Sequence, residues 1–296
     1  MDGVDGGAAG PVVIAMVTHD SRPQLARLLD RQLAAAERLG TELIAADNDS
    51  RDGGLDLLRD AARRSSALRL VSLSHNRGYA AGVNAAFAAA PGRDVLLINP
   101  DVELAEPRVV ERLAGLLEAF PRAAVVAPRL TADDGSTQPS ARRFPTLGAM
   151  VATLPPLREL GPARRAYGRF VEPSQARRPV RVDWVIGAAM MIRRRAYEAV
   201  GGWDENFFLY MEDADFCRRC ARAGWEVAYA PEVALRHGYA RASSNGASLL
   251  RDRARRRHVA SLARFFAREP RLVLGRGRCP GMPAVSARAS AGGVDA

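Results

Sequence analysis

From Val12 to about Pro128 the sequence alternates short aliphatic runs with stretches whose apolar residues recur every three or four positions. The aliphatic runs predict buried strands, and the recurring pattern predicts amphipathic helices. Regular alternation of the two is typical of an α/β protein with a mostly parallel sheet. The predicted strands cover 12–18, 42–47, 68–72, 94–98 and 124–128, and the predicted helices cover 25–36, 78–90 and 107–120.

The pattern changes near Thr131. Residues 131–181 hold many Pro and Arg residues with little periodicity, which predicts a long loop. Order returns with strands at 182–193 and 226–229 and helices at 194–200 and 213–223. We therefore expect a disordered N-terminus (1–11), a main domain (12–246) divided near residue 130, a basic amphipathic helix (247–272) and a disordered tail (273–296).

The chain carries 43 basic and 33 acidic residues, a formal charge of +10, and every basic residue is Arg. Such an excess attracts nucleic acid, anionic lipid or phosphorylated ligands. Nucleic acid is the weakest of these expectations, because zinc-finger spacing and basic–aromatic runs are missing. Cys217 and Cys220 form a single C-x-x-C pair, too few ligands for structural zinc, and the sparse Cys content fits a reducing compartment.

No apolar run reaches the roughly 18 residues that cross a bilayer. The acidic, Gly-rich start does not resemble a signal peptide, so a cytoplasmic location is expected. Residues 249–266 combine an apolar side with several Arg residues, a pattern that suits peripheral contact with an anionic membrane. The alternative is that this helix packs on the domain and exposes a basic edge.

Polar clusters follow three of the predicted strands. They are Asp47-Asn48-Asp49-Ser50, the stretch from His75 to Asn84, and Asn99-Pro100-Asp101-Val102-Glu103. Ligands of open α/β sheets bind at the carboxyl ends of strands, where these clusters fall. The sequence has neither a P-loop nor a G-x-G-x-x-G motif after the first strand. A carboxylate such as Asp101, holding a divalent cation against a diphosphate, remains as the way to bind a nucleotide.

A second constellation spans Gly201 to Asp215, where three carboxylates occur within four residues after an aromatic segment. Acids also favour the first turn of any helix, which is the structural alternative. An apolar setting raises the proton affinity of a carboxylate and makes it usable as a general base. His237 follows the last predicted strand and adds a metal ligand to the set of candidates.

These motifs, in this order and spacing, resemble the family 2 glycosyltransferases of GT-A fold, especially the bacterial rhamnosyltransferase-like branch. The resemblance covers about Val12 to Arg241. It implies a Rossmann-like nucleotide-binding half (about 12–130), with a mixed, mostly parallel sheet, and an acceptor half (about 131–246). Thr18-His19-Asp20 resembles the family's Thr-Tyr-Asn-like turn, with His19 and Asp20 as departures. Asn99-Pro100-Asp101 resembles its Asp-x-Asp motif without the first Asp.

The resemblance also implies roles for individual residues. It implies that the nucleotide sugar is bound by Thr18, Asp47, Asp49, Asn76, Gly78, Asn84 and Asn99. On the acceptor side it implies Gly187, Trp203, Asp204, Glu205 and Asp215. It implies Mn²⁺ or Mg²⁺ on Asp101 and His237, and a catalytic pair of Asp213, the base, and Glu212.

The function that follows is an inverting, metal-dependent transfer of a sugar, L-rhamnose from dTDP-rhamnose by resemblance, to a glycan or lipid-linked acceptor in cell-wall or surface polysaccharide synthesis. The alternatives are transfer from a UDP-sugar, a non-catalytic nucleotide-sugar-binding protein of the same fold, a sugar-phosphate nucleotidyltransferase, and a basic module that binds nucleic acid or membrane. Ser21-Arg22-Pro23 does not supply the Gly-rich basic loop of a nucleotidyltransferase.

Overall fold

The computed structural model describes residues 10–105, 108–153, 160–238 and 253–273. The expected disordered tail and nearly all of the expected disordered N-terminus lie outside this range. The strands are β1 Gly10–Thr18, β2 Leu43–Asp47, β3 Leu68–Ser72, β4 Arg93–Ile98, β5 Val102–Glu103, β6 Ala123–Thr131, β7 Ala141–Arg142, β8 Val180–Val182, β9 Trp184–Val185, β10 Ala189–Ile192 and β11 Glu226–His237. The helices are α1 Arg22–Arg38, α2 Gly54–Arg64, α3 Tyr79–Ala88, α4 Arg108–Ala119, α5 Leu147–Val151, α6 Gly161–Val171, α7 Arg194–Ala199, α8 Glu212–Arg222, α9 Arg253–Arg268 and α10 Pro270–Val273, with the 3₁₀ turn η2 Glu172–Gln175.

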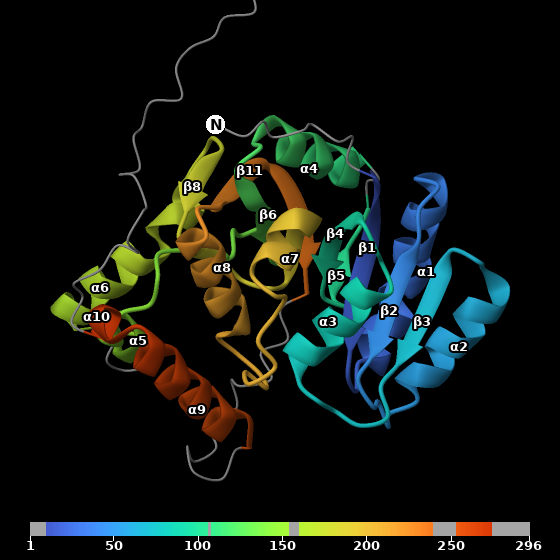
Figure 1. Cartoon of the computed structure of the whole chain (residues 1–296), viewed down its shortest axis with the longest axis horizontal. Coiled ribbons are helices and arrows are strands. Elements are labelled where there is room, and N and C mark those ends of the chain that lie inside the picture. The colour runs from blue at the N-terminus through green and yellow to red at the C-terminus, as the bar shows by residue number, and fades with distance from the viewer. Residues whose placement is uncertain (1–9, 106–107, 154–159, 239–252, 274–296) are drawn as a thin grey trace, which may run out of the picture.

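One sheet of nine strands runs through the described residues in the order β3-β2-β1-β4-β10-β6-β11-β5, with β8 also paired to β11 (Figure 1). Strands β1 to β4 are parallel to one another, and β10 runs antiparallel between β4 and β6. Since β10 follows residue 131 in the sequence, the two predicted halves share one sheet and are not spatially separate layers.

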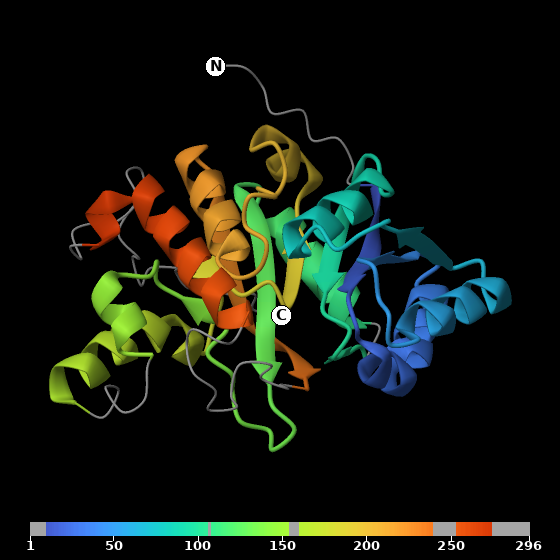
Figure 2. The same ribbon diagram turned by 90° about the horizontal axis from the view of Figure 1, so that it is seen from below.

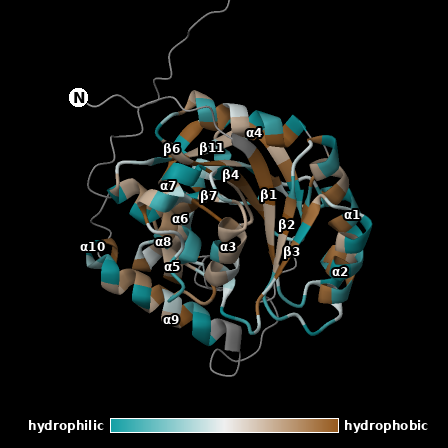
Figure 3. Ribbon diagram, turned by 45° about the vertical axis from the view of Figure 1, so that its right-hand side comes forward, coloured by the Kyte–Doolittle hydropathy of each residue, from teal (hydrophilic) through white to brown (hydrophobic). Residues whose placement is uncertain are grey.

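Alternate residues of β1 enter two different cores, as the pleat of a strand requires. Val13, Ala15 and Val17 face one core, and Ile14 and Met16 face the other. Helices α3, α7 and α8 cover the first side of the sheet, and α1, α2 and α4 cover the second. Burial on both faces explains why the strands read as continuous apolar runs, and Figure 3 shows them hydrophobic beneath more polar helices.

Helix α3 lies unusually close to the sheet because its residues are small. A Cβ built on Gly82 would collide with the Val17 side chain of β1. Ala80, Ala81 and Ala86 are buried on the same short helix. The small residues therefore hold the loop that precedes α3 near the end of β1, where the polar clusters gather.

Three helices of the structure depart from the predictions from sequence. Helix α2, which packs on α1 and β3, was not predicted. The region 131–181, expected to be a loop, contains α5 and α6. These two helices lie with α9 and α10 on the side of the molecule away from β3 (Figure 2). Among the described residues, no helix has the length and apolar character needed to span a bilayer.

Candidate active site

Thr18 and Asp47 lie side by side at the carboxyl ends of β1 and β2. Asp47 is fully buried, and its carboxylate accepts hydrogen bonds from Thr18 Oγ1 (2.9 Å), Ser50 Oγ (2.5 Å) and Ser50 N (3.0 Å). Asp49 adopts a positive φ of 62° and keeps a partly exposed carboxylate beside Arg51. Of the two predicted nucleotide-binding acids, Asp47 therefore holds the turn together, and Asp49 is the one that a ligand can reach.

Asn48 was missed as a functional candidate, although it stands in the middle of this cluster. Its side chain donates to the Gly78 carbonyl (2.8 Å) and accepts from Arg77 N (3.0 Å), while Asn76 Oδ1 accepts from Gly78 N (2.9 Å). Gly78 has a φ of 94°, and a Cβ there would lie 2.5 Å from the Phe208 carbonyl oxygen. This loop thus requires Gly78, and buried Asn48 fixes its position.

Asp101 and His237 come together from β4–β5 and the end of β11, with 3.3 Å between Asp101 Oδ1 and His237 Nε2. Gln138 orients the imidazole from the other side. Gln138 Nε2 donates to the His237 carbonyl (2.9 Å), so its Oε1 must be the atom 2.8 Å from His237 Nδ1. Because Oε1 only accepts, Nδ1 carries the proton, and in the neutral ring Nε2 faces Asp101 as a second acceptor.

A carboxylate oxygen and an imidazole nitrogen that face one another are both ligand types for a divalent cation, and the Gln138 contact is the outer support that metal-bound His residues commonly have. Asp101 and His237 stand as a pair, because no cluster of three or more His, Cys, Asp or Glu residues occurs within the described ranges. Water and substrate phosphate complete such a coordination sphere in nucleotide sites. The structure therefore brings the predicted pair together, as a shared metal site requires.

Asp213 and Glu212 occupy the first turn of α8, and their environments differ. Asp213 is half-buried, and its two oxygens accept hydrogen bonds from Gly187 N (2.9 Å) and Ala214 N (2.7 Å). Burial raises the pKa of Asp213, while these two backbone donors and the positive charge of Arg142 limit the rise.

Burial also raises the pKa of Glu212, well above its ordinary value, and the Asp213 carboxylate raises it further. Glu212 Oε2 has no hydrogen-bond partner among the described residues. Because the pKa of Glu212 is raised further than the pKa of Asp213, Glu212 is favoured in its neutral form and Asp213 in its ionised form.

Tyr79 connects the metal pair to this acidic pair. Its hydroxyl lies 2.9 Å from the Gly187 carbonyl and 3.1 Å from Asn99 Oδ1. Burial raises the pKa of Tyr79 far above its ordinary value, and the nearby carboxylates of Asp213 and Asp101 add to the rise. Tyr79 therefore remains a neutral donor that positions Asn99 and the Gly187 turn, a role that the sequence analysis did not assign.

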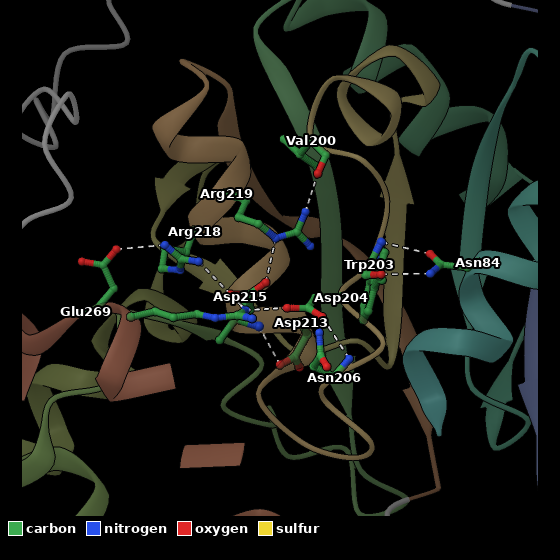
Figure 4. Close-up of polar contacts among 12 residues, drawn as sticks. Asn84, Val200, Trp203, Asp204, Asn206, Asp213, Asp215, Arg218, Arg219 and Glu269 are labelled. Carbon is green, nitrogen blue, oxygen red and sulfur yellow. Dashed lines mark hydrogen bonds and ion pairs between the residues drawn. The ribbon is translucent and has the colours of Figure 1, made fainter. Parts of the chain in front are cut away.

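The side chains of several residues predicted to face substrates are buried and contact other parts of the protein. Asp215 is fully buried and pairs with Arg218 (2.8 Å), Arg219 (2.7 Å) and Arg268 (3.2 Å) (Figure 4). Asp215 therefore does not face an acceptor, which corrects the prediction. Trp203 is also buried and stacks on Phe216, with ring centroids 5.3 Å apart.

Asn84 was predicted to bind the nucleotide sugar, but its side-chain amide makes hydrogen bonds to other residues of the protein. Asn84 Nδ2 donates to the Trp203 carbonyl (2.9 Å) and to Glu205 (3.0 Å), and Asn84 Oδ1 accepts from Trp203 N and Tyr197. Glu205 also pairs with Arg77 at 2.6 Å. Asn84 and Glu205 thus tie the donor-side loop to the 201–205 turn, and the geometry does not favour a ligand contact for Asn84.

Helix α9 lies along the segment 204–210 that leads to α8. Ser261 donates to the Leu209 carbonyl (3.0 Å), Arg257 stacks on Phe208 at 3.5 Å, and Arg268 pairs with Asp204 at 2.5 Å. Phe265 is fully buried, and Leu262 and Phe266 pack on the core. Leu262, Phe265 and Phe266 of α9 are therefore used within the protein, which supports the packing alternative for this helix, although Val259 is 58% exposed. Residues 249–252 lie outside the described range.

Arg142 of β7 lies near Asp213. Its guanidinium stacks over Trp184 and Phe170, with its Cζ 5.2 and 5.4 Å from the ring centroids, and Nε donates to the Pro139 carbonyl (2.7 Å). Its charge is near enough to lower the pKa of Asp213. A fixed cation beside a candidate base is suited to a substrate that carries phosphate.

Comparison with known proteins identifies a family and related sequences. A family model described as glycosyltransferase-like family 2 matches residues 10–259. The chain is 36% identical over 238 residues to N-acetylglucosaminyl-diphospho-decaprenol L-rhamnosyltransferase from Mycobacterium tuberculosis, covering 76% of this chain and 75% of that protein. It is 26% identical over 273 residues to rhamnosyltransferase WbbL from Escherichia coli, covering 87% and 93%.

Among solved structures, the mannosyltransferase PcManGT from Pyrobaculum calidifontis, in complex with GDP-Man and Mn²⁺, superposes with a TM-score of 0.60 at 19% identity. The match covers 92% of this chain and 66% of that one. At this identity the likeness establishes the fold alone. Together with the sequence matches, it shows that the chain belongs to glycosyltransferase family 2 and has the GT-A fold.

Proposed function

We propose that this protein transfers L-rhamnose from dTDP-L-rhamnose, with inversion, to a hydroxyl of a sugar carried on a polyprenyl diphosphate, in cell-wall or surface polysaccharide synthesis. The sugar is suggested by both rhamnosyltransferase relatives, and the lipid-linked acceptor by the Mycobacterium tuberculosis relative. The structural observation that carries the proposal is Asp213, an oriented carboxylate with a raised pKa at the start of α8.

We assign Asp213 as the general base of the catalytic step. The Gly187 and Ala214 amides fix its carboxylate, and it takes the proton from the acceptor hydroxyl as that oxygen attacks the anomeric carbon. The bond from the anomeric carbon to the diphosphate breaks on the opposite face, so a single displacement inverts the centre. Glu212 holds its proton and keeps a second negative charge out of the site.

On the donor side, we propose that Asp49, Asn76, Gly78 and Asn99 contact the nucleotide sugar, with Thr18 and Asp47 shaping the turn that presents them. Asp101 and His237 would hold Mn²⁺ or Mg²⁺, with Gln138 fixing the imidazole. When bound there, such a cation would supply positive charge that offsets the charge of the diphosphate. Trp203, Asp204 and Glu205 shape the acceptor side around Gly187. We place the reaction at the cytoplasmic face of the membrane, where a polyprenyl acceptor would be met.

The test is a panel of nucleotide sugars, dTDP-rhamnose and UDP-sugars among them, offered with a short-chain N-acetylglucosaminyl diphosphate lipid and Mn²⁺. We expect nucleoside diphosphate to be released from dTDP-rhamnose and from no other donor of the panel. EDTA should abolish this release, and NMR should show an inverted linkage in the product. Asp213→Asn is the matched control. Release from a UDP-sugar instead would replace the donor, and nucleotide-sugar binding without release by the wild type would favour a non-catalytic binding protein.

A further inference from the structure

Exposed apolar side chains concentrate on one edge of the molecule. Among the described residues, five large hydrophobic side chains are exposed, and three of them are Leu147 (48%), Val151 (41%) and Leu160 (58%). Leu147 and Val151 are four residues apart on α5 and share its outward side. Leu160 directly precedes α6, which packs against α5. Scattered exposed hydrophobics are ordinary, but three within fourteen positions on two packed helices form a surface.

Positive charge gathers in the same part of the chain. Residues 141–182 contain nine Arg and two Glu, a net charge of +7 out of +10 for the whole protein. The exposed residues of α6 form a broad outward stripe that includes positions 161, 164, 165, 168 and 169; it contains Arg164, Arg165 and Arg169, and Arg164 lies one turn from Leu160. Apolar side chains rimmed by Arg are complementary to the headgroup region of an anionic membrane.

The inner side of α6 leads to the candidate base. Phe170 is buried and packs against Trp184 and the Arg142 guanidinium, whose charge acts on Asp213. The outward stripe of α6 is therefore about one helix diameter, roughly 10 Å, from this contact. Leu147 follows Arg142 by five residues, so the chain limits their separation to about 17 Å. A sugar diphosphate held on a lipid could span this distance while its lipid tail stays in the bilayer.

We propose that the outward faces of α5 and α6, formed by Leu147, Val151, Leu160, Arg164, Arg165 and Arg169, dock the protein on an anionic lipid surface. This α5–α6 surface replaces α9 as the membrane-binding element. The inference rests on the proposed function in one respect, because docking at this edge serves a lipid-linked acceptor.

Vesicle flotation tests the docking directly, with phosphatidylcholine alone and with phosphatidylcholine mixed with phosphatidylglycerol. Arg164→Gln/Arg165→Gln/Arg169→Gln should lower partitioning onto the mixed vesicles about 100-fold, since each Arg near an anionic surface contributes about fivefold. Leu147→Ser/Val151→Ser/Leu160→Ser should lower it at least tenfold. All six side chains are exposed, so the melting temperatures should stay close to that of the wild type.

Two control variants separate this surface from general attraction. Arg38→Gln/Arg59→Gln/Arg63→Gln removes the same charge from α1 and α2, at the opposite end of the molecule (Figure 1), and should leave flotation within about twofold because these charges lie beyond a Debye length. Arg256→Gln/Val259→Ser on α9 should also leave it unchanged. Flotation that survives in both α5–α6 variants, or falls equally in either control, overturns the proposal.

Transfer to a water-soluble, short-chain acceptor distinguishes this inference from the proposed function. The α5–α6 variants should retain that activity and lose transfer to a long-chain acceptor embedded in vesicles. Absence of transfer in the wild type with every acceptor would contradict the proposed function, whereas unchanged flotation with intact transfer would contradict the docking surface alone.

Discussion

The donor side and the acceptor side of this site are held together by different forces. At the ends of β1 and β2, Thr18, Asp47 and Asn48 make hydrogen bonds to strand ends and turns that lie between 3 and 30 positions away. On the acceptor side, α8 is held by buried ion pairs, and its Arg218 pairs with Glu269, 51 positions away. The donor side is thus held within the N-terminal part of the chain, whereas the acceptor side depends on the C-terminal helices.

The largest expected effect concerns the chemical step on the acceptor side. Asp213→Asn keeps the size of the side chain but cannot take a proton, so turnover should fall by about 10²-fold or more, with little change in donor affinity. Glu212→Gln, which resembles the protonated acid already present, should retain most of the turnover. Single-turnover rates with saturating donor would measure both. The assignment fails if the two variants lose equal amounts.

The pH dependence sharpens the same assignment. Asp213 accepts a proton only when ionised, so turnover should rise with pH through its pKa and disappear below it. Because burial raises that pKa, the midpoint of the acidic limb should lie above 3.8, the ordinary value for an aspartic acid. In Glu212→Gln the midpoint should hardly move, since Glu212 is neutral throughout. A kcat–pH profile measures this, and a large shift would show that Glu212 is ionised.

The next prediction concerns a variant that disrupts the ion pairs of Asp215 on the acceptor side. Asp215→Asn removes the fully buried carboxylate that pairs with Arg218 and Arg219 and leaves Arg218, 4% exposed, with Glu269 as its remaining counter-charge, and we expect a loss of about 3 kcal/mol in the free energy of unfolding. Asp47→Asn on the donor side removes acceptors for neutral donors only, and should cost about 1–2 kcal/mol. Urea denaturation of both variants measures the difference. Equal losses would remove the distinction between the two sides.

The smallest expected effect is on Mn²⁺ binding by Asp101 and His237, on the donor side. Asp101→Ala and His237→Ala should both weaken Mn²⁺ binding and abolish the part of activity that EDTA inhibits. Gln138→Met keeps the volume but frees the imidazole, and should weaken Mn²⁺ binding about tenfold. Electron paramagnetic resonance of Mn²⁺ with the free enzyme measures binding independently of turnover, and His237 NMR shifts should report the changed tautomer. Unaltered Mn²⁺ binding in Gln138→Met would limit Gln138 to a packing role.

The sequence predicted the sheet because each central strand is an unbroken aliphatic run, and such runs are buried whatever surrounds them. It did not predict α2, whose buried positions are few and whose start is a pair of Gly residues. Helices α5 and α6 were taken for a loop because they are short and Pro and Gly flank or begin them. Local pattern alone was insufficient at these places.

The candidate site shows the same limit in its side chains. Asp101 and His237, 136 positions apart, were placed together by resemblance, and the structure brings them within 3.3 Å. Asp215 and Asn84 were assigned to substrates because they stand inside motifs. Asp215 pairs with Arg218 and Arg219 on its own helix and also with Arg268, 53 positions away, and the Trp203 partner of Asn84 is 119 positions away. Sequence motifs located the site, but tertiary contacts decide which polar groups remain available to a ligand.

The donor loop and the acceptor loop touch through main-chain atoms. Tyr79 N donates to the Phe208 carbonyl at 2.9 Å, and Gly78 leaves no space for a side chain between them. No substitution of the Phe208 side chain can delete that hydrogen bond, since the carbonyl belongs to every residue type. Acceptor loops of different sequence can therefore be grafted at this joint without redesigning the donor loop, provided that Gly78 is kept and the backbone path through residue 208 is preserved.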